Sequence, residues 1–149
     1  MQSSATLQPF LGFTIGEHGL AIRLSEVMDV SELRDIRPVP GAPPIVRGVA
    51  NLRGRAITVL DTAELLYVRE EPSRWAARLA PPRENLALAL GSDVDIFRVE
   101  AGTLQRAPDP SGISFEEAVS GERVWQLLSL SAIVSRLDEE MVTALSRTG

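Results

Sequence analysis

Residues 38–61 read PVPGAPPIVRGVANLRGRAITVLD, and this stretch carries the clearest structural signals in the chain. Its prolines hold the first part extended, because a residue that precedes proline disfavours the α region. Apolar residues then alternate with others over residues 45–52, and a second apolar run covers residues 56–60. Both runs are typical of β-strands. Residues 53–55, RGR, indicate a tight turn between them, so the stretch predicts a β-hairpin.

The residues before this stretch predict a second hairpin. Residues 10–15 and 20–24 are apolar runs of strand length, and the turn between them, GEHG, is rich in residues that tolerate a positive φ. Residues 25–30 carry mixed signals that fit either a short helix or an irregular strand. On the other side of the quoted stretch, Asp61 or Thr62 can cap a short helix that follows.

The rest of the chain predicts further strands and one long helix. Residues 67–84 are rich in charge and proline and are interpreted as a linker, with at most a turn or two of helix around Trp75–Leu79. Strand patterns follow at residues 86–90, 94–99, 113–119 and 123–128. The last element is a helix whose apolar residues share one face and are expected to lie on the β-structure: Ile133, Val134, Leu137, Met141, Ala144 and Leu145.

Composition limits the class of protein. The chain has 149 residues, enough for one domain, and 44% of them are hydrophobic and 23% charged, as in soluble globular proteins. Its longest apolar stretches are far shorter than the ~20 residues that a membrane span needs, and its N-terminus lacks the regions of a signal peptide. We therefore expect a cytoplasmic protein with no membrane insertion. The net charge of −5 argues against nucleic acid as a direct partner.

Few residues of the chain are suited to catalysis or metal binding. There is no cysteine, which excludes disulfides and thiolate chemistry, and the one histidine, His18, lies in a glycine-flanked turn. The sequence has neither a G-x-S-x-G motif nor a phosphate-binding glycine loop. We therefore expect no catalytic residue, no cofactor and no metal. The alternative is a small ligand-binding or enzymatic β-barrel that uses His18 or a pocket between two barrels. Trp75 and Trp125 fit a core and an interface equally well.

Residues 38–61 resemble the signature of the CheW family of chemotaxis coupling proteins. In that family a P-x-A-P-x-x-x-x-G-V-x-N-L-R-G run precedes an apolar strand that ends in Asp. The opening hairpin and residues 27–30, VMDV, also fit, so the resemblance is good over residues 10–66 and faint beyond them. It implies a mainly β fold of two small five-stranded SH3-like barrels packed together, followed here by the C-terminal helix.

The resemblance also implies a function. Proteins of the family are non-enzymatic adaptors that couple the cytoplasmic tips of chemoreceptors to a CheA-type histidine kinase within an array. We therefore expect chemoreceptors, such a kinase and other CheW-like proteins as partners. Carried over residue by residue, the resemblance implies a partner-binding site of Val27, Asp29, Gly48, Asn51 and Arg53. Gly54 allows the turn that presents Arg53, whose guanidinium offers a fixed fork of donors to carboxylates or carbonyls of a helical partner.

The second half departs from the family pattern. If Val94-Asp95 is the V-D pair of the family, a hairpin and most of a strand, about ten residues, are missing between Leu90 and Val94. This predicts a truncated second barrel and a weakened contact with the kinase, and in this the chain resembles the accessory CheW-like protein of the Myxococcus Frz system. The predicted organisation is a flexible N-terminus (1–9) and one CheW-like domain (10–149), divided into a well-matched first part (10–66), a linker (67–84) and a divergent second part (85–149).

Overall fold

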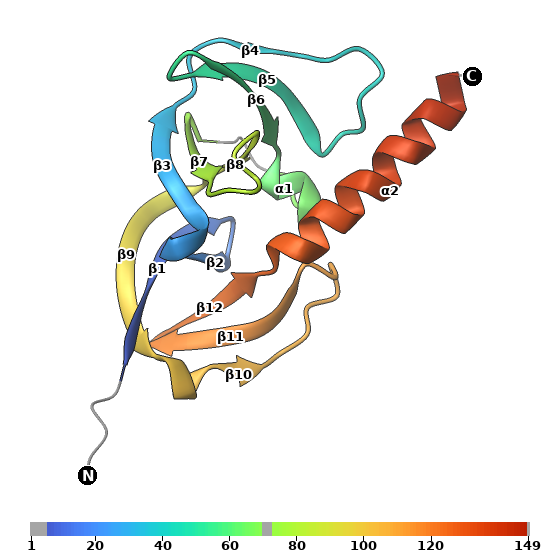
Figure 1. The fold of residues 1–149 in the computed structure, drawn as a ribbon. Coiled ribbons are helices and arrows are strands. Elements are labelled where there is room, and N and C mark those ends of the chain that lie inside the picture. Colours follow the sequence, from blue (N-terminus) through green and yellow to red (C-terminus); the bar gives the residue numbers. More distant parts are fainter. Residues whose placement is uncertain (1–5, 70–72, 149) are drawn as a thin grey trace.

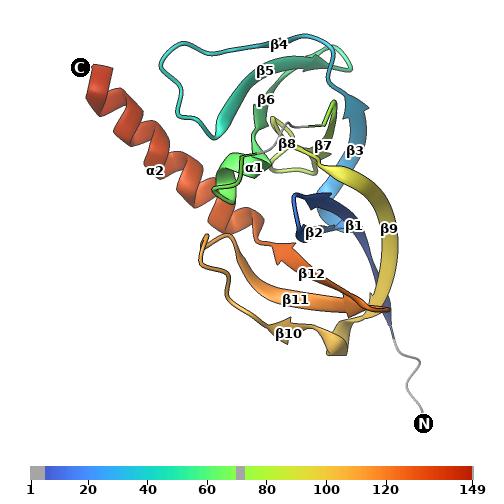
Figure 2. The ribbon, with the colours of Figure 1, turned by 180° about the vertical axis from the view of Figure 1, so that it is seen from behind.

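The structure of the chain, a computed structural model, describes residues 6–69 and 73–148. It consists of two six-stranded β-sheets and a long C-terminal helix, α2 (Leu130–Thr148). Figures 1 and 2 show the sheets as two curved lobes, with α2 projecting from the junction between them. The predicted mainly β architecture is confirmed. Each sheet has six strands where five were expected, because a strand of two residues lies at one edge of each.

The first sheet, here called the terminal sheet, is made by the two ends of the chain. In spatial order its strands are β10 (Gln105–Arg106), β11 (Ser114–Ser120), β12 (Arg123–Leu128), β2 (His18–Arg23), β1 (Leu7–Ile15) and β9 (Ser92–Glu100). β1 and β2 form the predicted opening hairpin. β2 then pairs in parallel with β12, which joins this hairpin to the hairpin of β11 and β12.

The second sheet, here called the middle sheet, uses one continuous part of the chain. In spatial order its strands are β3 (Val27–Glu32), β7 (Trp75–Leu79), β8 (Leu86–Ala89), β6 (Arg55–Leu60), β5 (Val46–Leu52) and β4 (Ile36–Arg37). β5 and β6 are the hairpin predicted from residues 38–61. The ambiguous residues 25–30 are divided between a short 3-10 helix, η1 (Leu24–Glu26), and the first part of β3, and a second 3-10 helix, η2 (Ala101–Thr103), follows β9.

One predicted linker contains a strand, so the interpretation of residues 67–84 is wrong where the structure describes them. β7 pairs with β3 on one side and with β8 on the other, and four of its five residues are buried. Its side chains are one tryptophan, two alanines, an arginine and a leucine, and alanine and arginine carry little strand signal. Residues 70–72 of this predicted linker lie outside the described residues.

Two further boundaries are corrected. A truncated second barrel was predicted from a hairpin missing between Leu90 and Val94, but β7 and β8 pair antiparallel directly before Leu90 and each sheet has six strands, so that prediction is wrong. β9 begins at Ser92, shortly after β8 ends, and pairs with β1 from Leu7 to Thr14. The predicted flexible N-terminus, 1–9, overlaps β1, which begins at Leu7; its residues 1–5 lie outside the described residues.

Three hydrophobic clusters hold the sheets together. The largest, here called the inter-sheet core, lies between the two sheets and includes Phe13, Leu20, Leu60, Leu88 and Ile133. The other two belong to one sheet each: one includes Ala50, Ile57 and Val59, and the other includes Phe10, Ala118 and Trp125. β1 and β8 contribute to two clusters each, because alternate residues of a strand face opposite sides. This explains why both strands are apolar on both faces.

Trp125 is a core residue of the terminal sheet. It is 5% exposed, and its ring stacks on Phe97 at 4.8 Å, which in turn stacks on Phe10 at 5.5 Å. Gly12 makes room for this stack, because a Cβ on Gly12 would lie 2.8 Å from Cε1 of Phe97 and 2.9 Å from Cζ3 of Trp125. The sequence left open whether Trp125 belongs to a core or an interface, and the structure places it in a core.

Helix α2 packs on the sheets through its first half only. Leu130 and Ile133 are buried in the inter-sheet core, and Val134 and Leu137 pack against it. The helix then extends away from both lobes (Figure 1), and Met141 and Leu145 are 39% and 68% exposed, whereas Ala144 is half-buried and lines a depression with residues 41–44. The prediction that the whole apolar stripe lies on the β-structure is therefore wrong for Met141 and Leu145. Among the described residues no helix combines the length and the apolar character needed to span a membrane.

The start of α2 is tied to the end of a short helix, α1 (Thr62–Leu65). Nη1 of Arg136 donates a hydrogen bond to the carbonyl oxygen of Leu65 at 2.6 Å, and its Nε lies 2.8 Å from Oε2 of Glu140. α1 itself is capped as predicted, since the Asp61 side chain accepts a hydrogen bond from the N–H of Glu64.

Candidate partner-binding site

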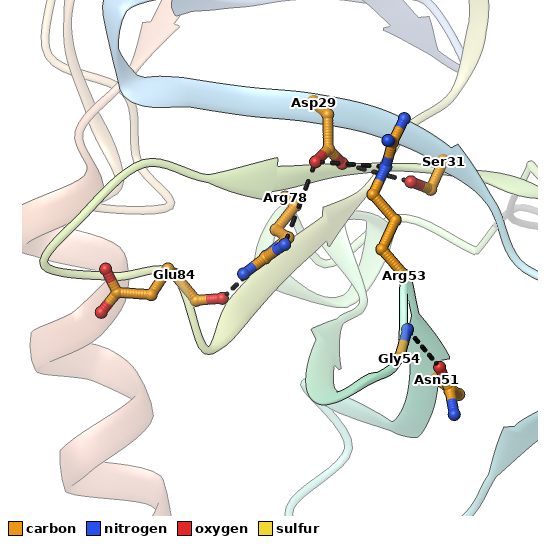
Figure 3. Close-up of polar contacts among 7 residues, drawn as sticks. All are labelled: Asp29, Ser31, Asn51, Arg53, Gly54, Arg78 and Glu84. Atoms are coloured by element: carbon orange, nitrogen blue, oxygen red, sulfur yellow. Dashed lines mark hydrogen bonds and ion pairs between the residues drawn. The ribbon is translucent and has the colours of Figure 1, made fainter.

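The turn between β5 and β6 presents Arg53 to solvent. Arg53 and Gly54 have φ values of 52° and 82°, and two successive residues with positive φ suit a two-residue hairpin turn. Oδ1 of Asn51 accepts a hydrogen bond from the N–H of Gly54 at 2.9 Å, which closes the turn (Figure 3). The Arg53 side chain remains 67% exposed. Asn51 therefore shapes the turn that carries Arg53.

The Arg53 side chain reaches from this turn to Asp29 on β3. Its Nε lies 3.5 Å from Oδ2 of Asp29, whose side chain is 19% exposed. Oδ1 of Asp29 accepts a hydrogen bond from the Ser31 hydroxyl at 3.1 Å. Figure 3 shows the two side chains meeting across the space between β3 and the turn. Two of the five residues predicted for the site are thus brought together by the fold.

A second arginine, which the sequence did not single out, lies on the other side of the same carboxylate. Nη1 of Arg78, on β7, is 4.0 Å from Oδ2 of Asp29, and the Arg78 side chain is only 7% exposed. Its Nε donates a hydrogen bond to the carbonyl oxygen of Glu84 at 3.1 Å (Figure 3). Asp29, Arg53 and Arg78 are here called the charge cluster. Arg78 was not found from the sequence because it falls in the stretch interpreted as a linker.

Gly48 lies where the edge strand β4 packs closely against β5 in the middle sheet. Its φ is 153°, and a Cβ built on it would lie 2.5 Å from the carbonyl oxygen of Arg37 on β4. A β-bulge separates Val46 from Gly48 in the pairing of β5 with β6. Gly48 is buried, so its role in the structure is to let β4 lie against β5.

Val27 also lies away from the charge cluster. It is half-buried, packs against the inter-sheet core and stands opposite Leu79 of β7. A bulge between Val27 and Asp29 changes the register of β3 at this point. Of the five predicted site residues, Asp29 and Arg53 therefore touch, Asn51 supports them, and Val27 and Gly48 belong to the framework.

An exposed apolar surface adjoins the charge cluster. Trp75 and Val30 are 45% and 37% exposed, and both line a shallow depression together with Arg34, Asn51 and Arg53. The same two apolar residues line a second depression with Arg74 and Val94, which lies at the border between the two sheets. Exposed tryptophan beside arginine is the composition of an interaction hot spot. Of the two roles left open for Trp75, its exposure fits an interface.

This surface carries surplus positive charge although the whole chain is acidic. Three arginines, Arg34, Arg53 and Arg74, line the two depressions around Trp75, against two carboxylates, Glu32 and Asp93. Glu32 pairs with Arg34 at 3.0 Å, and Asp29 is shared between two arginines. The surface therefore offers apolar area next to arginine guanidiniums. It is suited to bind a protein segment with an apolar side chain and nearby carboxylates.

Two carboxyl groups outside the charge cluster have shifted pKa values. Burial raises the pKa of Glu26, just before β3, although Arg23 and Arg83 oppose the shift. For Asp109, burial also favours the neutral form, but hydrogen bonds from Ser111 and Gln126 and the charge of His18 together outweigh it, and the pKa is lowered. Asp109 thereby stabilises the loop between β10 and β11.

The structure gives the alternative sites little support. His18 is exposed at the start of β2. The interior between the two sheets is filled by the inter-sheet core, and the depression at their border, which Trp75 and Val94 line, is open to solvent. In the described part of the chain, no three histidine, aspartate or glutamate side chains are grouped closely enough to hold a metal ion.

Comparison with known protein sequences identifies the family of this fold. Residues 9–138 match the family model of the CheW-like domain. The chemotaxis protein CheW of Thermotoga maritima is 45% identical over 58 residues, which are 39% of this chain and 38% of the relative. The chemotaxis protein CheW of Treponema pallidum is 33% identical over 58 residues, 39% of this chain and 34% of the relative. The aligned segments thus span little more than a third of each relative.

The fold is also similar to a solved structure over nearly its whole length. The scaffolding protein TtCheW from Thermoanaerobacter tengcongensis superposes with a TM-score of 0.76 at 14% identity, over 87% of this chain and 89% of that one. This agreement covers both sheets, which is consistent with six complete strands in each. With the family model matching residues 9–138, the chain belongs to the CheW family.

Proposed function

We propose that this protein is a non-enzymatic adaptor that couples the cytoplasmic tips of chemoreceptors to a CheA-type histidine kinase in a bacterial chemosensory array. Membership of the CheW family supports the adaptor role. The observation that carries the receptor contact is the position of Arg53: it projects from a fixed turn, is two-thirds exposed, and lies beside exposed Trp75 and Val30.

The chemistry of this surface suits the tip of a helical receptor. A helix that presents an apolar side chain to Trp75 would place carboxylates one turn away within reach of Arg53 or Arg34, because residues three and four apart share a helix face. Arginine can hold a carboxylate through two parallel hydrogen bonds, which gives orientation as well as attraction. The surrounding positive charge would also speed the encounter with an acidic partner.

The proposal includes a kinase contact of ordinary strength. The expectation of a weakened contact depended on a truncated second barrel, and both sheets have six strands. Other CheW-like proteins remain further proposed partners, since arrays repeat the same subunits. The proposed location is the cytoplasmic side of receptor clusters.

Titration of the chain with a purified cytoplasmic signalling fragment of a chemoreceptor tests this function. We expect Arg53→Glu to weaken binding at least tenfold, because it replaces an exposed cation by an anion at the centre of the surface. Arg55→Glu is the matched control, since Arg55 is exposed two residues away on β6 and makes no ion pair with the residues that the structure describes. No binding by the unaltered chain would refute the receptor role, and equal loss in both variants would remove Arg53 as its centre.

A further inference from the structure

Arg78 is a buried arginine with a fixed guanidinium. It is one of three polar or charged residues that are buried within the described residues, with Thr62 and Ser114. A buried charge is tolerated only when it is paired and hydrogen-bonded. Both conditions are met, because its Nε donates to the backbone carbonyl of Glu84 and its Nη1 faces Oδ2 of Asp29 at 4.0 Å.

One carboxylate oxygen is shared by two arginines. Oδ2 of Asp29 lies 3.5 Å from Nε of Arg53 and 4.0 Å from Nη1 of Arg78, while Oδ1 is occupied by Ser31. Two cations and one anion leave the charge cluster with a surplus positive charge. Since Arg78 is buried and Arg53 is 67% exposed, this surplus is presented to solvent by Arg53.

We propose that Arg78 is a positioning residue that keeps Arg53 available for a carboxylate of a partner. This inference rests on the proposed function, because it concerns the same surface. When Arg53 turns from Asp29 to a partner, Asp29 remains compensated by Arg78 and is not left as an unpaired, largely buried carboxylate. Without Arg78, Asp29 and Arg53 form a closed neutral pair, and a partner must break that pair before it can bind Arg53.

The shape of the cluster supports this division of roles. Arg78 is held in place by its hydrogen bond to the carbonyl oxygen of Glu84, so its guanidinium cannot move toward a partner. Arg53 contacts Asp29 through its Nε, and this is its one ion pair among the described residues. The Arg53 end of this ion pair is 67% exposed, so water screens the contact and Arg53 can exchange between partners. Arg53 is thus the movable cation and Arg78 the permanent one.

The first test is a binding series with the receptor fragment. We expect Arg78→Met to weaken binding roughly three- to tenfold, since it leaves Arg53 as the one cation for Asp29. Arg78→Lys, which keeps the charge, should bind within about twofold of the unaltered chain. Arg106→Met is the control for net charge, because Arg106 lies on β10 at the far edge of the terminal sheet.

The decisive variant is Arg78→Met combined with Asp29→Asn. If Arg78 acts by leaving Arg53 available, removal of the Asp29 charge frees Arg53 again and restores binding to within about twofold. If Arg78 only supports the fold, the second change deepens the loss, and that result overturns the proposal. Should Arg78→Met fail to fold, Arg78→Gln removes the charge while it retains a donor for the carbonyl of Glu84.

A second measurement needs no partner. Nuclear magnetic relaxation of the Arg53 Nε–H group in the free protein reports how tightly its side chain is held. We expect a higher order parameter in folded Arg78→Met than in the unaltered chain, and no change in Arg106→Met. An unchanged order parameter overturns the role of Arg78 whatever the receptor titration shows. If instead the unaltered chain binds no receptor fragment while Arg53 becomes more ordered, the proposed function fails and this inference stands.

Discussion

The carboxylate of Asp29 on β3 lies 4.0 Å from the guanidinium of Arg78 on β7, a residue 49 positions further along the chain. The two strands are neighbours at one edge of the middle sheet, and Asp29 stands opposite Arg78 in their register. Because alternate residues face opposite sides of a sheet, directly opposed residues share a face. This pairing brings a buried cation to the carboxylate that also holds Arg53.

Replacement of Asp29 by asparagine should destabilise the protein. The change leaves the Arg78 guanidinium buried without its counter-charge, and loss of one partner of a buried pair costs about 3–5 kcal/mol. Since Asp29 is 19% exposed and the contact is 4.0 Å, we expect about 1–3 kcal/mol, measured by urea unfolding. Asp35→Asn, at an exposed position in the loop after β3, is the control. Equal stability of the two variants would contradict the role of Asp29 as counter-ion.

Replacement of Gly48 by alanine should open the edge of the middle sheet. The new Cβ would lie 2.5 Å from the carbonyl oxygen of Arg37, at a φ of 153° that side chains rarely adopt. The steric clash with the Arg37 carbonyl and the unfavourable φ together predict a loss of about 2–4 kcal/mol in the free energy of unfolding. Gly102→Ala is the matched control, because a Cβ there meets no atom within 4 Å. A similar stability of both variants would show that β4 moves at little cost.

Replacement of Glu26 by glutamine should stabilise the protein at neutral pH. Burial raises the pKa of Glu26 in the folded state, so the fold disfavours its ionised form. The folded state then binds a proton more readily than the unfolded chain, and stability falls as pH rises through the shifted pKa. We expect Glu26→Gln to unfold at higher urea than the unaltered chain at pH 7, with the difference shrinking below the ordinary glutamate pKa. Glu17→Gln, at an exposed position in the β1–β2 turn, is the control for the substitution itself.

Replacement of Trp75 by alanine should affect binding more than stability. Trp75 is 45% exposed and lies beside Arg53, so its truncation should weaken receptor-fragment binding at least tenfold, as for an interface hot spot. We expect a loss of stability of about 1 kcal/mol or less, because Trp75 is not a member of the three hydrophobic clusters described above. Phe115→Ala removes an aromatic ring of similar exposure from the terminal sheet and should leave receptor binding unchanged. A large stability loss with unaltered binding would assign Trp75 to the core.

The hairpin of residues 46–60 could be predicted from the sequence because its signals are local. Alternation of apolar residues, two adjacent prolines and a glycine in the turn act within a few residues of one another. The same holds for the β1–β2 hairpin and for the first half of α2. The presentation of Arg53 by a tight turn could be predicted for the same reason, and Asn51 adds the hydrogen bond that closes it.

The stretch 67–84 could not be interpreted in this way. β7 is a strand because β3 and β8 lie on both sides of it and its alanines fill narrow space in two clusters. Small side chains give no periodic signal on their own, since their burial depends on what packs against them. The linker interpretation also hid Arg78, whereas the predicted truncation of the second barrel came from taking Val94-Asp95 as the V-D pair of the family.

The family signature, the mainly β class and the hairpin that carries Arg53 could be recognised from local patterns, because each depends on residues close together in the chain. Only the folded chain brings Arg53 and Arg78 to the same carboxylate oxygen of Asp29 and leaves Trp75 exposed beside them. These three charged residues come from β3, from the β5–β6 turn and from β7, which meet only when the middle sheet closes around its core. An ion pair between distant strands is set by register and packing, and neither is encoded in a local pattern.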